Sequence, residues 1–172
     1  GKIQQTKALI DQANLEGIQV HADQYPYSAC STTILKKLPD WCLEGGPLAT
    51  VQRVKNLSLR PKIIASIENP LPHEEDAFLN CSWDEIILSY LLSEKYKPYQ
   101  GKTIAEVAEE LKENPYNILF DLIIEESKYD PPRDNAIYFT LSEEDVQGVL
   151  KHDKTMIGSD GYSYASYGIF SE

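Results

Sequence analysis

The chain is poor in the residues from which metal centres and disulfide frameworks are built. Its 172 residues include three cysteines and three histidines, and none stands at a spacing typical of zinc sites, such as His-x-His or His-Glu-x-x-His. Because three is an odd number, we expect Cys30, Cys42 and Cys81 to be reduced, partly buried thiols of a cytoplasmic protein. The sequence therefore offers no self-contained metal centre and no disulfide-stabilised fold.

Positive charge is scarce as well. Sixteen lysines and arginines stand against 27 aspartates and glutamates, which gives a net charge of −11. Because binding to phosphates needs clustered Lys and Arg, nucleic acids and anionic membrane surfaces are not expected partners. No apolar run approaches the ~20 residues of a membrane-spanning helix, and the first residues lack a signal-peptide pattern. With 42% hydrophobic and 25% charged residues, the chain is typical of a soluble globular domain.

One polar pair stands out at the end of an apolar segment near the C-terminus. The stretch 155–161 reads Thr-Met-Ile-Gly-Ser-Asp-Gly, in which Met156 and Ile157 are expected to finish a buried strand. Asp160 would then project from the end of that strand, where barrel enzymes place their chemistry. The alternative is a simple turn, in which Asp bonds its own backbone and Gly takes a positive φ.

Hydrophobic periodicity predicts helices that alternate with strands. Gly17 is expected to end the first helix, and Thr103 with Glu106 forms a capping box that starts another. Asn114 is expected to cap the next helix, and Pro61 to interrupt a helical region at 48–68. The predicted helices are 3–16, parts of 48–68, 103–111, 115–123 and 142–150, and the predicted strands are 18–23, 83–92, 135–140 and 155–160.

Two other segments complete the pattern. The first helix is expected to bury Ile3, Leu9, Ile10 and Ala13 on one side. Residues 68–76 have no apolar period and are expected to form a solvated loop with His73 exposed. The order helix-strand, mixed middle, strand-helix-strand indicates an α/β fold with a largely parallel sheet in its outer parts.

Five blocks of the sequence resemble, in the same order, the N-acyl-D-amino-acid deacylases (D-aminoacylases) of the amidohydrolase superfamily. The blocks are DQYPYSACST at 23–32, LPDWCLEGG at 38–46, YQGKTIAEVA at 99–108, YFTLSEEDV at 138–146 and MIGSDG at 156–161. The resemblance extends over nearly the whole chain. It implies a zinc-dependent (β/α)₈ barrel that hydrolyses the amide of an N-acyl-D-amino acid.

This resemblance also implies a domain organisation. Residues 1–44 and 131–172 would be segments of a partial (β/α)₈ TIM barrel with three barrel strands, 18–23, 135–140 and 155–160. Residues 45–130 would be an inserted small α+β region between them. A barrel of this type needs about 250 residues, so the chain is expected to be a fragment.

The resemblance assigns roles to three side chains. Asp160 takes the position of the catalytic carboxylate that also neighbours the metal, accepts a proton from the attacking water and passes it to the leaving amine. Tyr25 and Ser31 take the positions of the hydroxyls that bind the substrate carboxylate. Cys30 stands where the family shows glycine, so its bulk is expected to alter the loop beside the pocket. Tyr27 is expected to pack, and His21 to be a buried, hydrogen-bonded histidine.

Other parts of the family's site are absent from the sequence. The family's metal-binding histidines would precede Gly1, and an arginine that clamps the substrate carboxylate would follow Glu172. Because a catalytic zinc site needs about three protein ligands, Asp160 alone is not expected to hold the metal. The chain by itself is therefore predicted to be inactive, and its partial barrel to expose strand edges and apolar faces that favour self-association.

Two other functions stay open at this point. The first is that of another amidohydrolase branch, such as a dihydroorotase or hydantoinase, which shares the terminal Asp but lacks the Tyr-Pro-Tyr and Pro-x-Trp blocks. The second is a non-catalytic interaction module, whose contact surface would use aromatic residues of the middle region.

Overall fold

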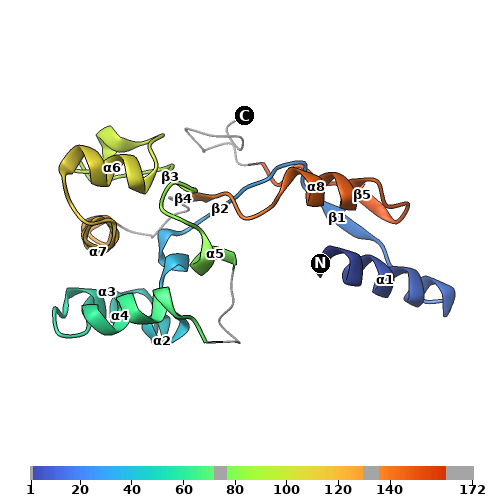
Figure 1. Cartoon of the computed structure of the whole chain (residues 1–172), viewed down its shortest axis with the longest axis horizontal. Helices are drawn as coiled ribbons and strands as arrows, with labels where there is room; N and C mark the ends of the chain where they lie inside the picture. The colour runs from blue at the N-terminus through green and yellow to red at the C-terminus, as the bar shows by residue number, and fades with distance from the viewer. Residues whose placement is uncertain (1, 72–76, 130–135, 162–172) are drawn as a thin grey trace.

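The computed structural model describes residues 2–71, 77–129 and 136–161, which form two lobes joined by two chain segments (Figure 1). The small lobe contains the two ends of the chain: α1 (Lys2–Leu15), β1 (Ala22–Gln24), α8 (Glu143–Leu150) and β5 (Thr155–Ile157). The large lobe contains everything between them. Its strands are β2 (Cys30–Thr32), β3 (Ile86–Leu88) and β4 (Ala136–Tyr138), and its helices are η1 (Ile34–Lys37), α2 (Asp40–Leu43), α3 (Gly46–Lys55), α4 (Arg60–Glu68), α5 (Ala77–Asn80), η3 (Lys97–Tyr99), α6 (Ile104–Leu111) and α7 (Pro115–Glu126).

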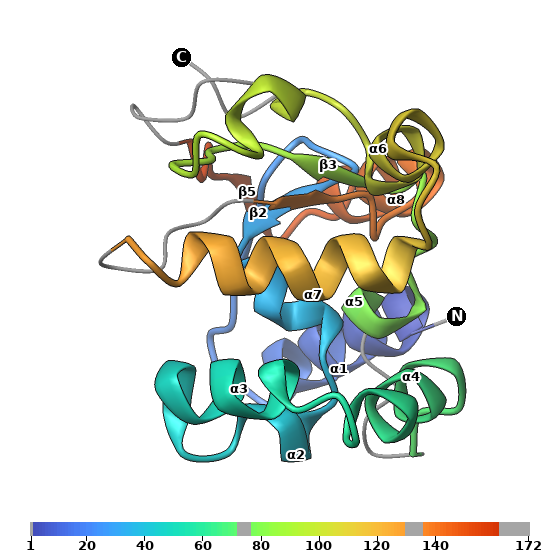
Figure 2. The ribbon, with the colours of Figure 1, turned by 90° about the vertical axis from the view of Figure 1, so that its left-hand side faces the viewer.

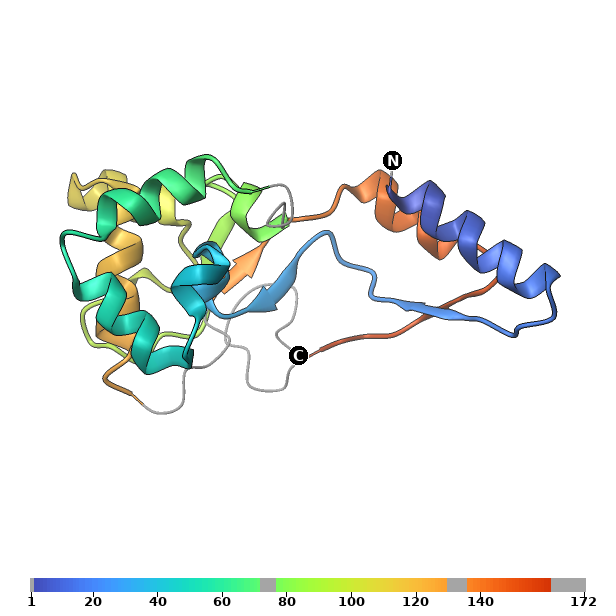
Figure 3. The ribbon, with the colours of Figure 1, turned by 90° about the horizontal axis from the view of Figure 1, so that it is seen from below.

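The small lobe is built on a parallel pair of strands. β1 pairs with β5, with Ala22 opposite Thr155 and Gln24 opposite Ile157. Helix α8 packs against both strands, and α1 packs against α8 (Figure 3). Polar contacts also join the two helices, because Lys7 Nζ donates to the carbonyl oxygen of Gly148 at 3.1 Å. The predicted parallel arrangement of the outer parts of the chain is confirmed for this pair.

The prediction that β5 is buried is wrong for this chain. Met156 is 55% exposed and Ile157 73% exposed. Within the described residues this sheet has two strands with α8 packed against them, whereas parallel sheets are normally covered on both faces. Two further burial predictions fail in the same lobe, since Leu9 and His21 are both exposed.

The large lobe contains a three-stranded antiparallel sheet in the order β2-β4-β3. The prediction that 135–140 supplies a third barrel strand is therefore wrong, because β4 pairs antiparallel with both neighbours and not with β1 or β5. All three residues of β4 are buried, which suits a central strand. Of its strands, β2 precedes the 45–130 segment in the chain and β4 follows it. The sheet therefore includes residues from outside that segment.

Helices cover one side of this sheet in layers. In Figure 2, α7 lies between α6 and the layer formed by α2, α3 and α4, and α7 contacts both α6 and α3. The main core gathers side chains from all of these helices and from one face of the sheet, among them Val54, Ile63, Leu88, Phe120 and Tyr138. Cys42 and Cys81 lie in this core as free thiols, and Cys30 is half-buried against it, as predicted.

Local signals placed the helix ends well. The capping box forms as predicted, with Thr103 accepting from Glu106 N and Glu106 accepting from Thr103 N. Asn114 caps α7, and the helical region at 48–68 is divided into α3 and α4. Gly17 ends α1 with a left-handed φ of 84°. The predicted loop residue His73 lies outside the described residues.

Candidate functional site

The candidate site lies where the two parallel strands end. Gln24 and Ile157 form the last registered pair, and beyond it Gly158 N donates to the carbonyl oxygen of Gln24 at 3.2 Å. Tyr25 follows β1 directly, and Asp160 lies three residues beyond the end of β5. Because the strands are parallel, their carboxyl ends meet at one edge. The fold therefore brings Tyr25 and Asp160 to the same end of the sheet.

Asp160 itself adopts a backbone conformation that L-residues seldom use. Its φ is 47°, in the left-handed region, and its side chain is exposed. Asp and Asn tolerate this region better than other residues with a Cβ. The alternative of a simple turn expected a glycine in this conformation, whereas here the carboxylate-bearing residue takes it.

Tyr25 is a half-buried donor whose ring stacks on that of Tyr27, with 5.9 Å between centroids. Burial raises the pKa of the Tyr25 phenol, and the negative charges of Cys30 and Asp160 raise this pKa further. The hydroxyl therefore stays protonated near neutral pH and can donate a hydrogen bond to an anion. The charge of Asp160 is the smallest of the three causes of this raised pKa, and both residues lie at the carboxyl end of the β1–β5 pair.

Ser31 lies on the neighbouring lobe, in the middle of β2. It is half-buried and stands opposite Ile137 in the antiparallel register, so both side chains are on one face of the sheet. Ile137 packs with Ala29, and Tyr27 packs against them as predicted. Ser31 therefore shares its face with Tyr27, which stacks on Tyr25. These contacts connect the Ser31 face of the sheet to Tyr25 through Tyr27.

Cys30 points to the other face of the same strand. It stands opposite the core residue Tyr138, and its Sγ lies 3.9 Å from the Tyr138 carbonyl oxygen and 3.8 Å from Thr140 Oγ1. Its bulk is thus directed toward the main core, where it packs. A thiol at this position therefore affects packing on the core face of β2 more than the opposite face, on which Ser31 lies.

Asp23 is a second carboxylate at this end of the sheet, and sequence patterns did not single it out. A Cβ added at Gly158 would lie 3.9 Å from the Cβ of Asp23, so the two residues face each other across the strands. Asp23 is exposed and lies two residues before Tyr25, on the same side of an extended chain. The two-residue spacing of Asp23 and Tyr25 was the feature of the sequence from which this position could have been predicted.

The described part of the chain does not contain a complete metal site. Among residues 2–71, 77–129 and 136–161, no three His, Cys, Asp or Glu side chains gather closely enough to hold a metal ion. His152 is engaged elsewhere, with its Nε2 lying 3.1 Å from Asp11 Oδ1. Among the same residues, no helix has the length and hydropathy needed to cross a membrane.

Comparisons with known proteins found relatives among solved structures only. No family model and no curated protein matches the sequence. An N-acyl-D-glutamate deacylase from Bordetella bronchiseptica, solved with zinc and a phosphonate mimic of the tetrahedral intermediate, matches 96% of this chain at 20% identity and a TM-score of 0.57. A D-aminoacylase, described with a binuclear metal centre, matches 96% of it at 25% identity and a TM-score of 0.52. A second D-aminoacylase structure, described as defining a novel subset of amidohydrolases, gives the same values.

These matches cover a limited part of the solved proteins. The chain spans 24% of the length of each of these three structures. The match nevertheless extends over 96% of this chain. The chain is therefore similar, over 96% of its length, to a segment of solved N-acyl-D-amino-acid deacylases (D-aminoacylases).

Proposed function

We propose that the protein to which this segment belongs hydrolyses N-acyl-D-amino acids to a carboxylate and a D-amino acid. The observation that carries this proposal is the meeting of Asp160 and Tyr25 at adjacent ends of two parallel strands. A carboxylate and a protonated phenol within each other's electrostatic reach provide a base and an anion-binding donor. Hydrolysis of an amide that carries a free carboxylate needs both.

Asp160 serves in this proposal as the proton carrier. Its exposed carboxylate accepts the proton of the water that attacks the acyl carbonyl. It then gives that proton to the nitrogen of the D-amino acid as the amide C–N bond breaks. The proton count balances, because one proton leaves the water and one reaches the departing amine.

Tyr25 and Ser31 bind the substrate carboxylate. Both carry hydroxyls that can donate hydrogen bonds, and the raised pKa of Tyr25 keeps its phenol in the donating form. The two come from different lobes, so the substrate would lie at the junction between them. The stacked pair of Tyr25 and Tyr27 supports this placement, since it links the end of β1 to the Ser31 face.

Zinc belongs to the proposal only at the level of the whole enzyme. When bound, a zinc ion polarises the acyl carbonyl and activates water. The described residues do not fit a complete zinc site, and Asp160 is the ligand that this proposal takes from them. The roles proposed for Asp160, Tyr25 and Ser31 are therefore derived from the chemistry of these side chains and not from a metal ion.

A substrate panel on the full-length enzyme tests this function. We expect release of D-amino acids from N-acetyl-D-amino acids, no turnover of the L-enantiomers, and no turnover of dihydroorotate or hydantoins. The isolated 172-residue chain, supplied with zinc, should show no turnover. Hydrolysis of cyclic amides with inactivity toward all N-acyl-D-amino acids would place the enzyme in another amidohydrolase branch.

A further inference from the structure

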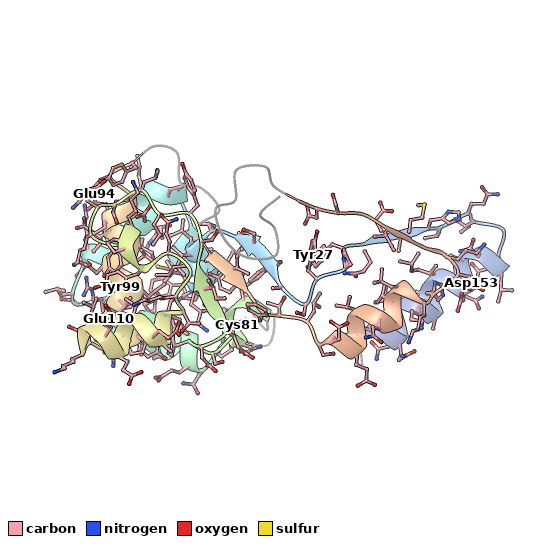
Figure 4. All side chains as sticks on the ribbon, turned by 90° about the horizontal axis from the view of Figure 1, so that it is seen from above. Tyr27, Cys81, Glu94, Tyr99, Glu110 and Asp153 are labelled. Atoms are coloured by element: carbon pink, nitrogen blue, oxygen red, sulfur yellow. The ribbon has the colours of Figure 1, made fainter. Side chains whose placement is uncertain are left out.

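The connection between the two lobes begins with a Tyr-Pro-Tyr sequence at residues 25–27. Tyr25 directly follows β1 of the small lobe. Tyr27 lies three residues before β2 of the large lobe, on the segment that joins the lobes in Figure 4. The proline between them restricts its own φ and the backbone of Tyr25. A short stretch of restricted backbone thus separates the two phenol rings.

The backbone of Tyr25 is held by the small lobe. Its carbonyl oxygen accepts from Gln24 Nε2 at 2.8 Å, and the Gln24 carbonyl oxygen accepts from Gly158 N at 3.2 Å. Neither hydrogen bond involves the Tyr25 side chain. The position of the hydroxyl therefore depends on what packs against the ring, because a rotation about χ1 moves the far end of a tyrosine most.

The ring of Tyr25 is in contact with the ring of Tyr27. Their centroids are 5.9 Å apart and their planes are inclined by 22°, which is a stacked arrangement. Aromatic pairs with such spacing attract each other beyond the effect of burial alone. This contact therefore favours one orientation of the Tyr25 ring.

Tyr27 itself is attached to the large lobe. It packs against the buried pair of Ala29 and Ile137, which are 0% and 1% exposed. The carbonyl oxygen of the next residue, Ser28, accepts from Leu141 N at 3.1 Å, so this segment is also joined to the second connection between the lobes. The ring of Tyr27 is thus held by the antiparallel sheet and its flanking chain.

We propose that Tyr27 is a positioning residue, which holds the Tyr25 ring by stacking so that the Tyr25 hydroxyl can donate to the substrate carboxylate. This inference rests on the proposed function and adds a residue to it. Tyr27 acts through Tyr25 and does not contact the reacting atoms. Because every N-acyl-D-amino acid carries this carboxylate, Tyr27 affects the binding of all of them and not the choice between their side chains.

Steady-state kinetics of the full-length enzyme test this role. Tyr27→Leu keeps an apolar side chain against Ile137 but removes the ring. It should raise KM about tenfold, as loss of one hydrogen bond to a charged group does, and leave kcat nearly unchanged. Tyr27→Phe keeps the ring and should have the wild-type KM. Tyr129→Leu is the matched control, because Tyr129 is a partly exposed tyrosine beyond the end of α7 in the same lobe, and its KM should equal that of the wild type.

A double mutant shows whether Tyr27 acts through Tyr25. Tyr25→Phe removes the hydroxyl, and in that background Tyr27→Leu should leave KM unchanged, since the contact that it misplaces is already absent. The ratio of the KM values for two N-acetyl-D-amino acids that the enzyme hydrolyses should be the same in Tyr27→Leu and in the wild type. If circular dichroism shows that Tyr27→Leu does not fold, Tyr27→Met replaces it, because an unbranched side chain adapts to the same space.

Several results would overturn the inference. A wild-type KM in Tyr27→Leu, equal defects in the Leu and Phe variants, or the same effect of Tyr27→Leu with and without the Tyr25 hydroxyl would each do so. So would a loss confined to kcat, or a changed ratio between the two substrates, since Tyr27 would then contact the substrate itself. All of these results leave the proposed function intact. A wild-type enzyme that hydrolyses no N-acyl-D-amino acid removes the proposed function and this inference together.

Discussion

Lys37 is a lysine whose ammonium group is buried in the large lobe. It is 3% exposed, and its Nζ donates to the Leu79 carbonyl oxygen at 2.7 Å and to the Cys81 carbonyl oxygen. The same Nζ lies 4.9 Å from the centre of the Trp83 ring. Burial lowers the pKa of Lys37 from 10.5 to about 8, and nearby Cys81 and Glu85 offset part of that effect.

This lowered pKa makes stability depend on pH. Between pH 8 and 10.5 the unfolded chain binds more protons at Lys37 than the folded chain does, so this residue's contribution to the free energy of unfolding rises with pH. The contribution should grow by about 3 kcal/mol between pH 7 and 11. Urea unfolding of the wild type and of Lys37→Met measures this contribution. As pH rises, the free energy of unfolding of the wild type should increase relative to that of Lys37→Met. A difference that stays constant or shifts the other way contradicts the assignment.

At the scale of elements, helix ends were predictable because their signals are local. Thr103 and Glu106 make the hydrogen bonds of a capping box within four residues, and no tertiary contact is needed to specify them. Strands were less predictable. The run 83–92 is β-prone throughout, yet within it only Ile86–Leu88 is a strand, and Gly101 N donates to the carbonyl oxygen of Leu88 at 2.7 Å.

The capping box gives a prediction at this scale. Thr103→Ala removes the acceptor for Glu106 N, and such a loss should lower the free energy of unfolding by about 1 kcal/mol. Equilibrium unfolding in urea, followed by circular dichroism at pH 7, measures the change. Ser58→Ala is the control, since Ser58 is exposed and its backbone N–H, not its hydroxyl, donates the local hydrogen bond to Asn56 Oδ1. Equal stability of the Thr103 variant and the control would show that the cap contributes nothing.

At the scale of the whole molecule, sequence patterns identified the parallel pair and the residues at its ends but misplaced β4. The segment 135–140 has the same apolar character as a barrel strand, and its antiparallel partners, Cys30–Thr32 and Ile86–Leu88, are distant in sequence. Pattern alone does not specify such long-range pairing. Tyr25 and Ser31 were predicted as site residues from the family resemblance, because their spacing in the sequence does not match any catalytic or binding motif by itself.

The small lobe predicts self-association. Met156 and Ile157 expose apolar surface on a strand whose outer edge is open in the described residues, and such edges pair readily with other strands. Sedimentation velocity of the isolated chain should show association that increases with concentration, and Ile157→Lys should reduce it. Leu48→Lys, an equally exposed apolar position on α3 in the other lobe, should leave it unchanged. Association that responds to Leu48 and not to Ile157 would move the contact to the large lobe.

The proposed function depends on the proximity of Asp160 and Tyr25, and this proximity can be tested on the isolated chain. With ¹³C-labelled tyrosine and a Tyr25→Phe variant to identify the signal, NMR titration gives the pKa of the Tyr25 phenol. In the wild type this pKa should lie above its ordinary value, and in Asp160→Asn it should fall, because the carboxylate charge that raises it is gone. An unchanged pKa in Asp160→Asn would mean that the two groups do not share a site.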